Sequence, residues 1–177
     1  CNNNGDNVLI LSIKHCLLDV FISLYYHYKD TYGHINVNYQ NKKGETLILL
    51  AIKQYQYEPK FYQLLFNECS SYIDFSIKNN KGENLLLYII ENYPQEHGLV
   101  RSLLYQENID VSAVNCDGKS VALLCLEYCP NEFPLLLENH GKNIDFSIKI
   151  NDISLLVEIL KKHQIYLSCA LDAILAQ

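Results

Sequence analysis

Short apolar runs recur along the chain, each after a polar turn that contains glycine. The runs occupy residues 8–13, 47–52, 85–90 and 121–126. A helix that is apolar almost all round must be buried on most of its sides. An amphipathic segment follows each run, at residues 20–24, 61–66, 99–104 and 133–137. The pattern predicts four units, each made of a buried first helix and a half-buried second helix.

The turn before each apolar run keeps the same residue types. Its glycine is Gly5, Gly44, Gly82 or Gly118, and asparagine lies three residues before it in every case. Two residues after the glycine comes an asparagine, threonine or serine: Asn7, Thr46, Asn84 and Ser120. Such side chains accept hydrogen bonds from the first free amides of a helix. We therefore predict that these four residues are helix N-caps.

A four-residue motif recurs between the units and shows how far apart they lie in the sequence. Ile35, Ile73, Ile109 and Ile144 each begin a phrase such as Ile-Asp-Phe-Ser, and they lie 38, 36 and 35 residues apart. A period in this range is typical of a solenoid, in which neighbouring units together bury one core. The predicted repeats are 2–40, 41–78, 79–114 and 115–148, with a divergent fifth at 149–177. In the fifth we expect a turn and cap at 151–154 and helices at 155–160 and 166–175. Because a solenoid offers an extended surface, binding is favoured over catalysis.

These motifs resemble the ankyrin-repeat family over essentially the whole chain. The family's Thr-Pro-Leu-His-x-Ala segment compares with Thr-Leu-Ile-Leu-Leu-Ala at 46–51, its Leu-Leu with residues 64–65, and its finger with Ile-Asp-Phe-Ser at 73–76. Leucine, isoleucine or valine replaces the family's proline and histidine, and the repeats exceed the usual length of about 33 residues. We expect the extra residues at helix ends and loops, at 29–34, 55–59 and 93–98.

The resemblance implies both a fold and a function. The fold is all-α, an ankyrin-repeat solenoid of helix-turn-helix units with short hairpin-like fingers, in a single domain spanning 1–177. The function is that of a non-catalytic protein-protein interaction module, a scaffold or adaptor. The alternative is a regulatory or spacer domain that packs against another domain of the same polypeptide and controls an enzyme outside this sequence.

The composition limits the classes of partner and the cellular compartments that we expect for this chain. The chain of 177 residues has 14 lysines and arginines against 20 aspartates and glutamates, which argues against nucleic-acid binding. Its apolar runs are too short for a transmembrane segment. Seven cysteines, an odd number, favour a reducing compartment. We expect the cytoplasm, with the nucleus as the alternative. The start at Cys1 and the lack of methionine suggest a fragment of a larger protein.

Candidate chemistry is sparse. Cys125 and Cys129 lie four residues apart with His140 downstream, but further ligands at metal-binding spacing are missing. Buried, reduced thiols are the favoured interpretation. The sequence Asp-Gly-Lys-Ser at 117–120 lacks the earlier glycine of a phosphate-binding loop and is a repeat turn. We therefore predict no enzyme activity, no cofactor and no metal site.

The resemblance also implies where a partner binds, because ankyrin-family partners meet the finger tips and the exposed end of the first helix on the concave side. The corresponding residues are Lys42, Lys43, Glu45, Lys53, Asn80, Lys81, Glu83, Glu91, Asp117, Lys119, Glu127 and Tyr128.

The charges of the predicted fingers are mainly positive. Six of the fourteen basic residues fall there: Lys42, Lys43, Lys78, Lys81, Lys119 and Lys149. Such a basic edge suits an acidic peptide or protein surface, and less favourably an anionic lipid headgroup. Ordinary solvation of exposed turns is the alternative.

Overall fold

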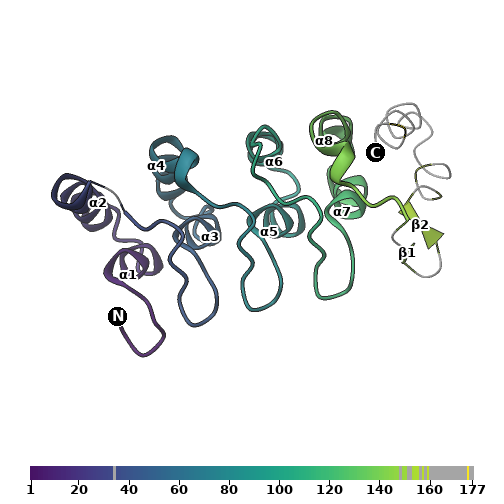
Figure 1. The fold of residues 1–177 in the computed structure, drawn as a ribbon. Coiled ribbons are helices and arrows are strands. Elements are labelled where there is room, and N and C mark those ends of the chain that lie inside the picture. Colours follow the sequence, from purple (N-terminus) through teal and green to yellow (C-terminus); the bar gives the residue numbers. More distant parts are fainter. Residues whose placement is uncertain are drawn as a thin grey trace. The chain divides into compact units, whose positions relative to one another are not determined.

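The structure, a computed structural model, describes residues 1–33, 35–147, 149–150, 153–155, 157, 159 and 175. The described chain forms two compact units, Cys1–Asn80 (unit 1) and Lys81–Gln177 (unit 2). Helices dominate both units, and each helix pair is preceded by a loop (Figure 1). None of the described helices is long and apolar enough to cross a membrane.

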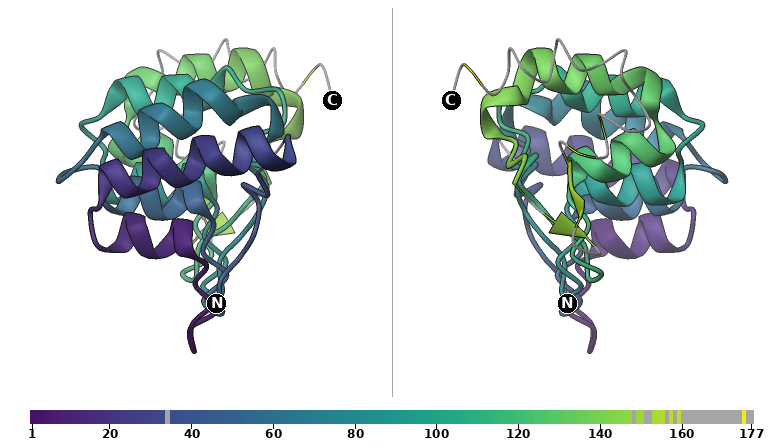
Figure 2. Two further views of the ribbon diagram at one scale, coloured as in Figure 1. Left: turned by 90° about the vertical axis from the view of Figure 1, so that its left-hand side faces the viewer. Right: turned by 90° about the vertical axis from the view of Figure 1, so that its right-hand side faces the viewer.

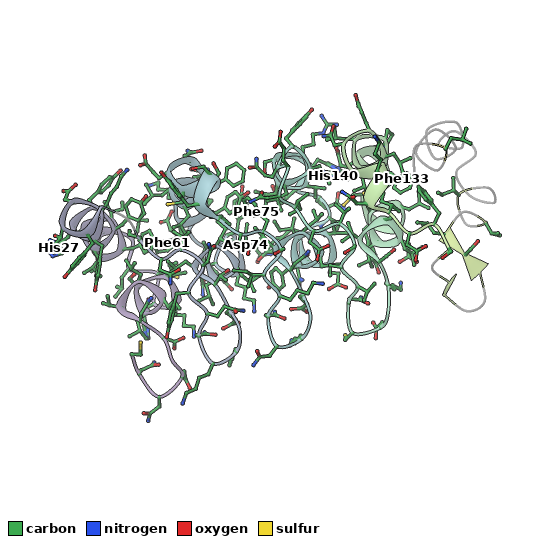
Figure 3. The ribbon with its side chains drawn as sticks, in the orientation of Figure 1. His27, Phe61, Asp74, Phe75, Phe133 and His140 are labelled. Atoms are coloured by element: carbon green, nitrogen blue, oxygen red, sulfur yellow. The ribbon has the colours of Figure 1, made fainter. Side chains whose placement is uncertain are left out.

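Unit 1 contains two helix pairs. They are α1 (Val8–Lys14) with α2 (Leu18–Tyr32), and α3 (Leu47–Lys53) with α4 (Lys60–Cys69), which continues into a 3-10 turn, η1 (Ser70–Tyr72). The two first helices, α1 and α3, pack against each other, and each packs against its own second helix. Phe21 of α2 and Phe61 of α4 meet edge to face at 5.3 Å between ring centroids, both fully buried. Figure 3 shows Phe61 inside this core.

Unit 2 repeats the arrangement. It contains α5 (Leu85–Asn92), α6 (His97–Leu104), α7 (Val121–Tyr128) and α8 (Phe133–His140), with short 3-10 turns η2 (Pro130–Glu132) and η3 (Gly141–Asn143). Here α5 packs against α7 and α6 packs against α8. Phe133 is fully buried, and the His140 ring Nε2 lies 2.8 Å from the Leu104 carbonyl oxygen (Figure 3). A short antiparallel pair, β1 (Lys149–Ile150) with β2 (Ile153–Ser154), follows.

The structure confirms the eight helices predicted for the first four repeats. It also confirms the four N-caps, because each predicted side chain accepts a hydrogen bond from the backbone amide three residues on: Asn7 from Ile10, Thr46 from Leu49, Asn84 from Leu87 and Ser120 from Leu123. The four turn glycines all have positive φ angles. Extra residues do extend a helix end, since α2 continues to Tyr32.

The recurring Ile-Asp-x-Ser phrase forms a turn at the start of each finger. In Asp74, Asp110 and Asp145 a carboxylate oxygen accepts hydrogen bonds from the amide and hydroxyl of the serine two residues later. These local bonds favour a turn over helix continuation. Most of the predicted fifth repeat lies outside the described residues. Within it, Ser154 does accept a capping bond from the Val157 amide.

Candidate functional site

The loops before α1 and α3 in unit 1 carry the first two predicted fingers, finger 1 (residues 2–7) and finger 2 (residues 40–46). Both project to the same side of unit 1, below the helices in Figure 1. An asparagine closes each loop: the side-chain oxygen of Asn41 accepts from the amides of Lys43 and Glu45, and Asn2 does the same for Asn4 and Asp6. Each finger is therefore an internally bonded turn.

Backbone hydrogen bonds join neighbouring fingers. The Lys42 amide donates to the Asn4 carbonyl at 2.9 Å, and the Asn80 amide donates to the Lys43 carbonyl at 3.0 Å. The Asn80 side chain also donates to the Lys42 carbonyl at 2.8 Å. The backbone that carries Lys42 and Lys43 is thus bonded to the neighbouring loop on each side, which holds the backbone of both residues in place.

An ionic network with buried carboxylates lies at the base of fingers 1 and 2, and it includes Glu45, a predicted contact residue that is buried and not exposed. Lys14 pairs with Asp6 at 2.6 Å, and Lys53 pairs with Glu45 at 2.6 Å. The Asn41 amide group joins the two carboxylates, donating to Asp6 at 2.9 Å and to Glu45 at 3.0 Å. Glu45 is only 8% exposed, since its carboxylate turns back toward α3.

The network keeps both carboxylates ionised. Burial alone would raise the pKa of Asp6 and of Glu45. The hydrogen bonds from Lys14 to Asp6 and from Lys53 to Glu45, together with those from Asn41, outweigh burial, so both pKa values lie below the ordinary range. The acidic charge of these two fingers is therefore neutralised inside the fold.

The other predicted contact residues fall into two groups. Lys42, Lys43 and Asn80 in unit 1 are exposed, as are Lys81, Asp117, Glu127 and Tyr128 in unit 2. Lys53, Glu83, Glu91 and Lys119 are half-buried. Lys119 pairs with Glu127 at 2.7 Å, and Glu91 accepts a hydrogen bond from Asn115 at 2.6 Å. The sequence analysis did not predict these ion pairs. A signal was present, because the paired residues lie eight positions apart in each case: Asp6 with Lys14, Glu45 with Lys53, and Lys119 with Glu127.

We define the finger surface as Lys42, Lys43 and Lys78 of unit 1, all exposed. Among the described residues, neither Lys42 nor Lys43 forms an ion pair. Because Asp6 and Glu45 are paired and buried, the exposed charge of finger 2 is positive. The side chain of Lys149 lies outside the described residues.

The predicted cysteine pair is buried. Cys125 and Cys129 are buried in α7 and just after it, and burial raises the pKa of both thiols, that of Cys129 to about 11. The described cysteines, which exclude Cys169, are all free thiols. Among the described residues, no group of three or more His, Cys, Asp or Glu side chains is placed to hold a metal ion.

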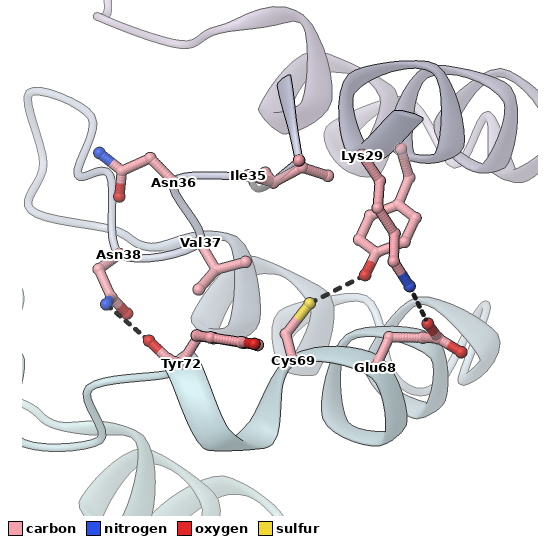
Figure 4. Close-up of a pocket in the computed structure, with 10 residues that line it drawn as sticks. Lys29, Ile35, Asn36, Val37, Asn38, Glu68, Cys69 and Tyr72 are labelled. Carbon is pink, nitrogen blue, oxygen red and sulfur yellow. Dashed lines mark hydrogen bonds and ion pairs between the residues drawn. The ribbon is translucent and has the colours of Figure 1, made fainter. Parts of the chain in front are cut away.

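A pocket of about 690 Å³ lies between α2, the end of α4 and the loop after α2 (Figure 4). Four of its side chains form two polar pairs: the Tyr25 hydroxyl with the Cys69 thiol at 3.1 Å, and Lys29 with Glu68 at 2.7 Å. Burial, followed by the contact with Cys69, raises the pKa of Tyr25. Burial likewise raises the pKa of Cys69. Because these four side chains already pair with one another, we assign the pocket no ligand.

Comparison with known proteins gives a structural likeness but no sequence match. No protein-family model matches the sequence, and no curated protein matches it. The structure is similar to the crystal structure of the ankyrin repeat domain of Bcl-3, a member of the IkappaB protein family, with a TM-score of 0.60. The likeness covers 97% of this chain and 73% of that one, at 19% sequence identity. This chain has the ankyrin-repeat fold. The fold predicted from the recurring motifs is therefore confirmed, and the degenerate ankyrin motifs at residues 44–51 and 73–76 are part of it.

Proposed function

We propose that this ankyrin-repeat chain is a non-catalytic protein-interaction module, and that unit 1 binds an acidic segment of a protein partner through the finger surface. The observation that carries the proposal is the burial and pairing of Asp6 and Glu45 beneath the exposed Lys42 and Lys43. A partner approaching the finger tips meets positive charge, although the whole chain carries a net charge of -6.

The backbone of finger 2 also favours binding at this surface. Since the amide of Lys42 and the carbonyls of Lys42 and Lys43 are already bonded to neighbouring loops, these residues lose little backbone freedom on binding. Charges at the rim of an interface mainly speed association and set its salt dependence. We therefore expect fast, salt-sensitive binding. The exposed predicted contact residues of unit 2, with Lys81 among them, form a separate proposed contact set on that unit.

Fluorescence anisotropy with a labelled acidic peptide tests the proposal. The probe is a twenty-residue peptide of alternating glutamate and serine. We expect the double substitution Lys42→Glu and Lys43→Glu to weaken binding at low salt about tenfold or more, a change of about 1.4 kcal/mol. Binding to the unmodified chain falls as salt rises from about 50 to 500 mM, because the Debye length shrinks to a few ångströms.

Lys60→Glu is the matched control, because Lys60 is exposed at the start of α4 and lies outside the fingers. It makes the same change in charge per site and leaves the finger surface intact. Equal weakening by Lys60→Glu and by a single Lys43→Glu would show that only net charge matters. That result, or binding insensitive to both substitutions, would refute the finger surface as the binding site.

A further inference from the structure

The first helix of unit 1 exposes apolar side chains at positions that are buried in the first helices of other repeats. Val8, the first residue of α1, is 43% exposed, whereas Leu47 of α3 and Val121 of α7 occupy the same place in their repeats and are 0% exposed. Leu11 is half-buried, and its counterpart Leu50 is buried. In α3 this side of the helix is covered by α1 of the preceding repeat.

The second helix of this repeat continues the apolar face. Val20, Leu24, Tyr28 and Tyr32 follow one another at intervals of four residues along α2, which places them on one side of the helix. Val20 and Tyr32 are 46% and 63% exposed. Tyr28 and Tyr32 contact each other at 5.7 Å between ring centroids. Within unit 1, α1 and α2 lie nearest the viewer in the left view of Figure 2, and Figure 3 shows His27, next to Tyr28, pointing away from the core.

The same side of the first repeat presents backbone donors whose counterparts bond to a preceding repeat. The Lys42 amide bonds to the Asn4 carbonyl, and the Asp74 amide bonds to the Asn38 side chain at 2.9 Å. The residues in the same places of the first repeat are Asn3 and Asn36. Within the described part of the chain, the amides of these two residues have no hydrogen-bond partner.

We define the open face as Val8, Leu11, Val20, Leu24, Tyr28 and Tyr32 with the amides of Asn3 and Asn36. We propose that a further helix-turn-helix repeat of the same polypeptide stacks on the open face, ahead of Cys1. It covers the apolar stripe, and it supplies a finger carbonyl to the Asn3 amide and a side-chain acceptor to the Asn36 amide, as finger 1 and Asn38 do for the second repeat. This proposal does not depend on the proposed function.

Two physical properties of the open face favour this occupant. Terminal repeats of a solenoid need a polar outer face, and the open face is apolar. A second copy of the chain that presented the same face would bring the donors of Asn3 and Asn36 against identical donors. The opposite side of a repeat carries acceptors such as the Asn4 carbonyl and the Asn38 side chain, and it therefore matches both the apolar area and the two amides.

A tandem chain tests whether the open face accepts a repeat. In it, residues 2–40 are duplicated directly ahead of residue 2, so that Gln40 precedes Asn2 as it naturally precedes Asn41. We expect hydrogen exchange at the amides of Asn3 and Asn36 in the original copy to slow about tenfold or more, and the melting temperature to rise. Val20→Glu in the original copy should abolish both gains. Ser23→Glu, exposed on α2 outside the stripe, should not.

A measurement on the natural protein keeps the proposal testable if the tandem chain fails to fold. Hydroxyl-radical footprinting should find Tyr32 less reactive in the natural polypeptide than in the 177-residue chain. Equal reactivity would overturn the proposal. So would a dimer of the 177-residue chain that Val20→Glu dissociates, since the open face would then bind a second copy. Unchanged amide exchange in a folded tandem chain would also overturn it.

Discussion

Glu45 lies in a finger, but its charged carboxylate is buried and paired inside the fold. The carboxylate accepts hydrogen bonds from both Lys53 and Asn41 and is almost fully shielded from water. Its charge therefore stabilises the folded chain and does not contact a partner. Removing one member of a shielded ion pair leaves the other poorly compensated, which costs more than the pair contributes at an exposed site.

Substitution of Glu45 should therefore destabilise the fold in a pH-dependent way. Because the pKa of Glu45 is lowered in the folded state, its contribution is present at pH 7 and is lost as the pH falls below the ordinary glutamate value. We expect Glu45→Gln to cost about 2 kcal/mol at pH 7 and less at about pH 3.5, which is below the ordinary glutamate pKa, because the unfolded chain binds a proton there before folded Glu45 does. Urea unfolding at the two pH values measures the difference.

The exposed pair of Lys119 and Glu127 provides the control for this experiment. The two side chains are 28% and 35% exposed, so Glu127→Gln should cost less than about 1 kcal/mol at pH 7. A cost for Glu45→Gln that is the same at both pH values would contradict the assignment of its ionised form to the buried network.

At the scale of the elements, the packing of neighbouring fingers requires their backbones to approach closely. Gly44 has a φ of +72°, and a Cβ atom there would lie 2.9 Å from the Asn79 Cα and the Asn80 nitrogen. Gly118 has a φ of +76°, and a Cβ atom there would have no atom within 4 Å. Both positions favour glycine through the backbone angle, but only Gly44 is also crowded by the neighbouring loop.

Comparing alanine substitutions at Gly44 and Gly118 separates the cost of backbone strain from the cost of crowding by the neighbouring loop. We expect Gly118→Ala to cost about 1 kcal/mol, the penalty for a left-handed residue with a side chain. Gly44→Ala should cost about 3 kcal/mol, since the loop of Asn79 and Asn80 must also move and its bonds to Lys42 and Lys43 weaken. Thermal unfolding of the two variants measures both costs. Equal costs would show that the contact between the loops is unimportant.

The helices and their caps were predictable from the sequence, whereas the partners of the charged residues were only partly so. Asn7, Thr46, Asn84 and Ser120 could be assigned because a cap acts within four residues, so the local sequence contains all of its atoms. The pairing of Glu45 with Lys53 also lies within one repeat, but it depends on how far the finger folds back over α3.

Long-range contacts explain what the sequence could not show. Glu132 is 1% exposed and pairs with Arg101 at 2.6 Å, and His97 lies 3.3 Å from its other oxygen. These residues are about thirty positions apart, and the pairing arises only when α6 and the turn before α8 are packed together. Nothing in the repeat pattern of the sequence marks these three residues.

Across the molecule, the repeats distribute charge and apolar area over different faces. In unit 1 the finger tips expose lysines, whereas α1 and α2 expose an apolar stripe. The proposed partner site and the proposed repeat contact therefore use different faces of unit 1. We propose that the acidic partner contacts Lys42, Lys43 and Lys78, and that it does not contact the outer helices.

Mapping by nuclear magnetic resonance shows whether the fingers, rather than the outer helices, contact an acidic partner. The labelled chain is titrated with the acidic peptide while its backbone amide signals are followed. We expect the largest shifts at residues 41–44 and 78–80, with small shifts along α2 and α4, and we expect the shifts to disappear in the Lys42→Glu and Lys43→Glu variant. Shifts concentrated on the tyrosines of α2 and on α4, with the finger amides unchanged, would contradict binding at the finger surface.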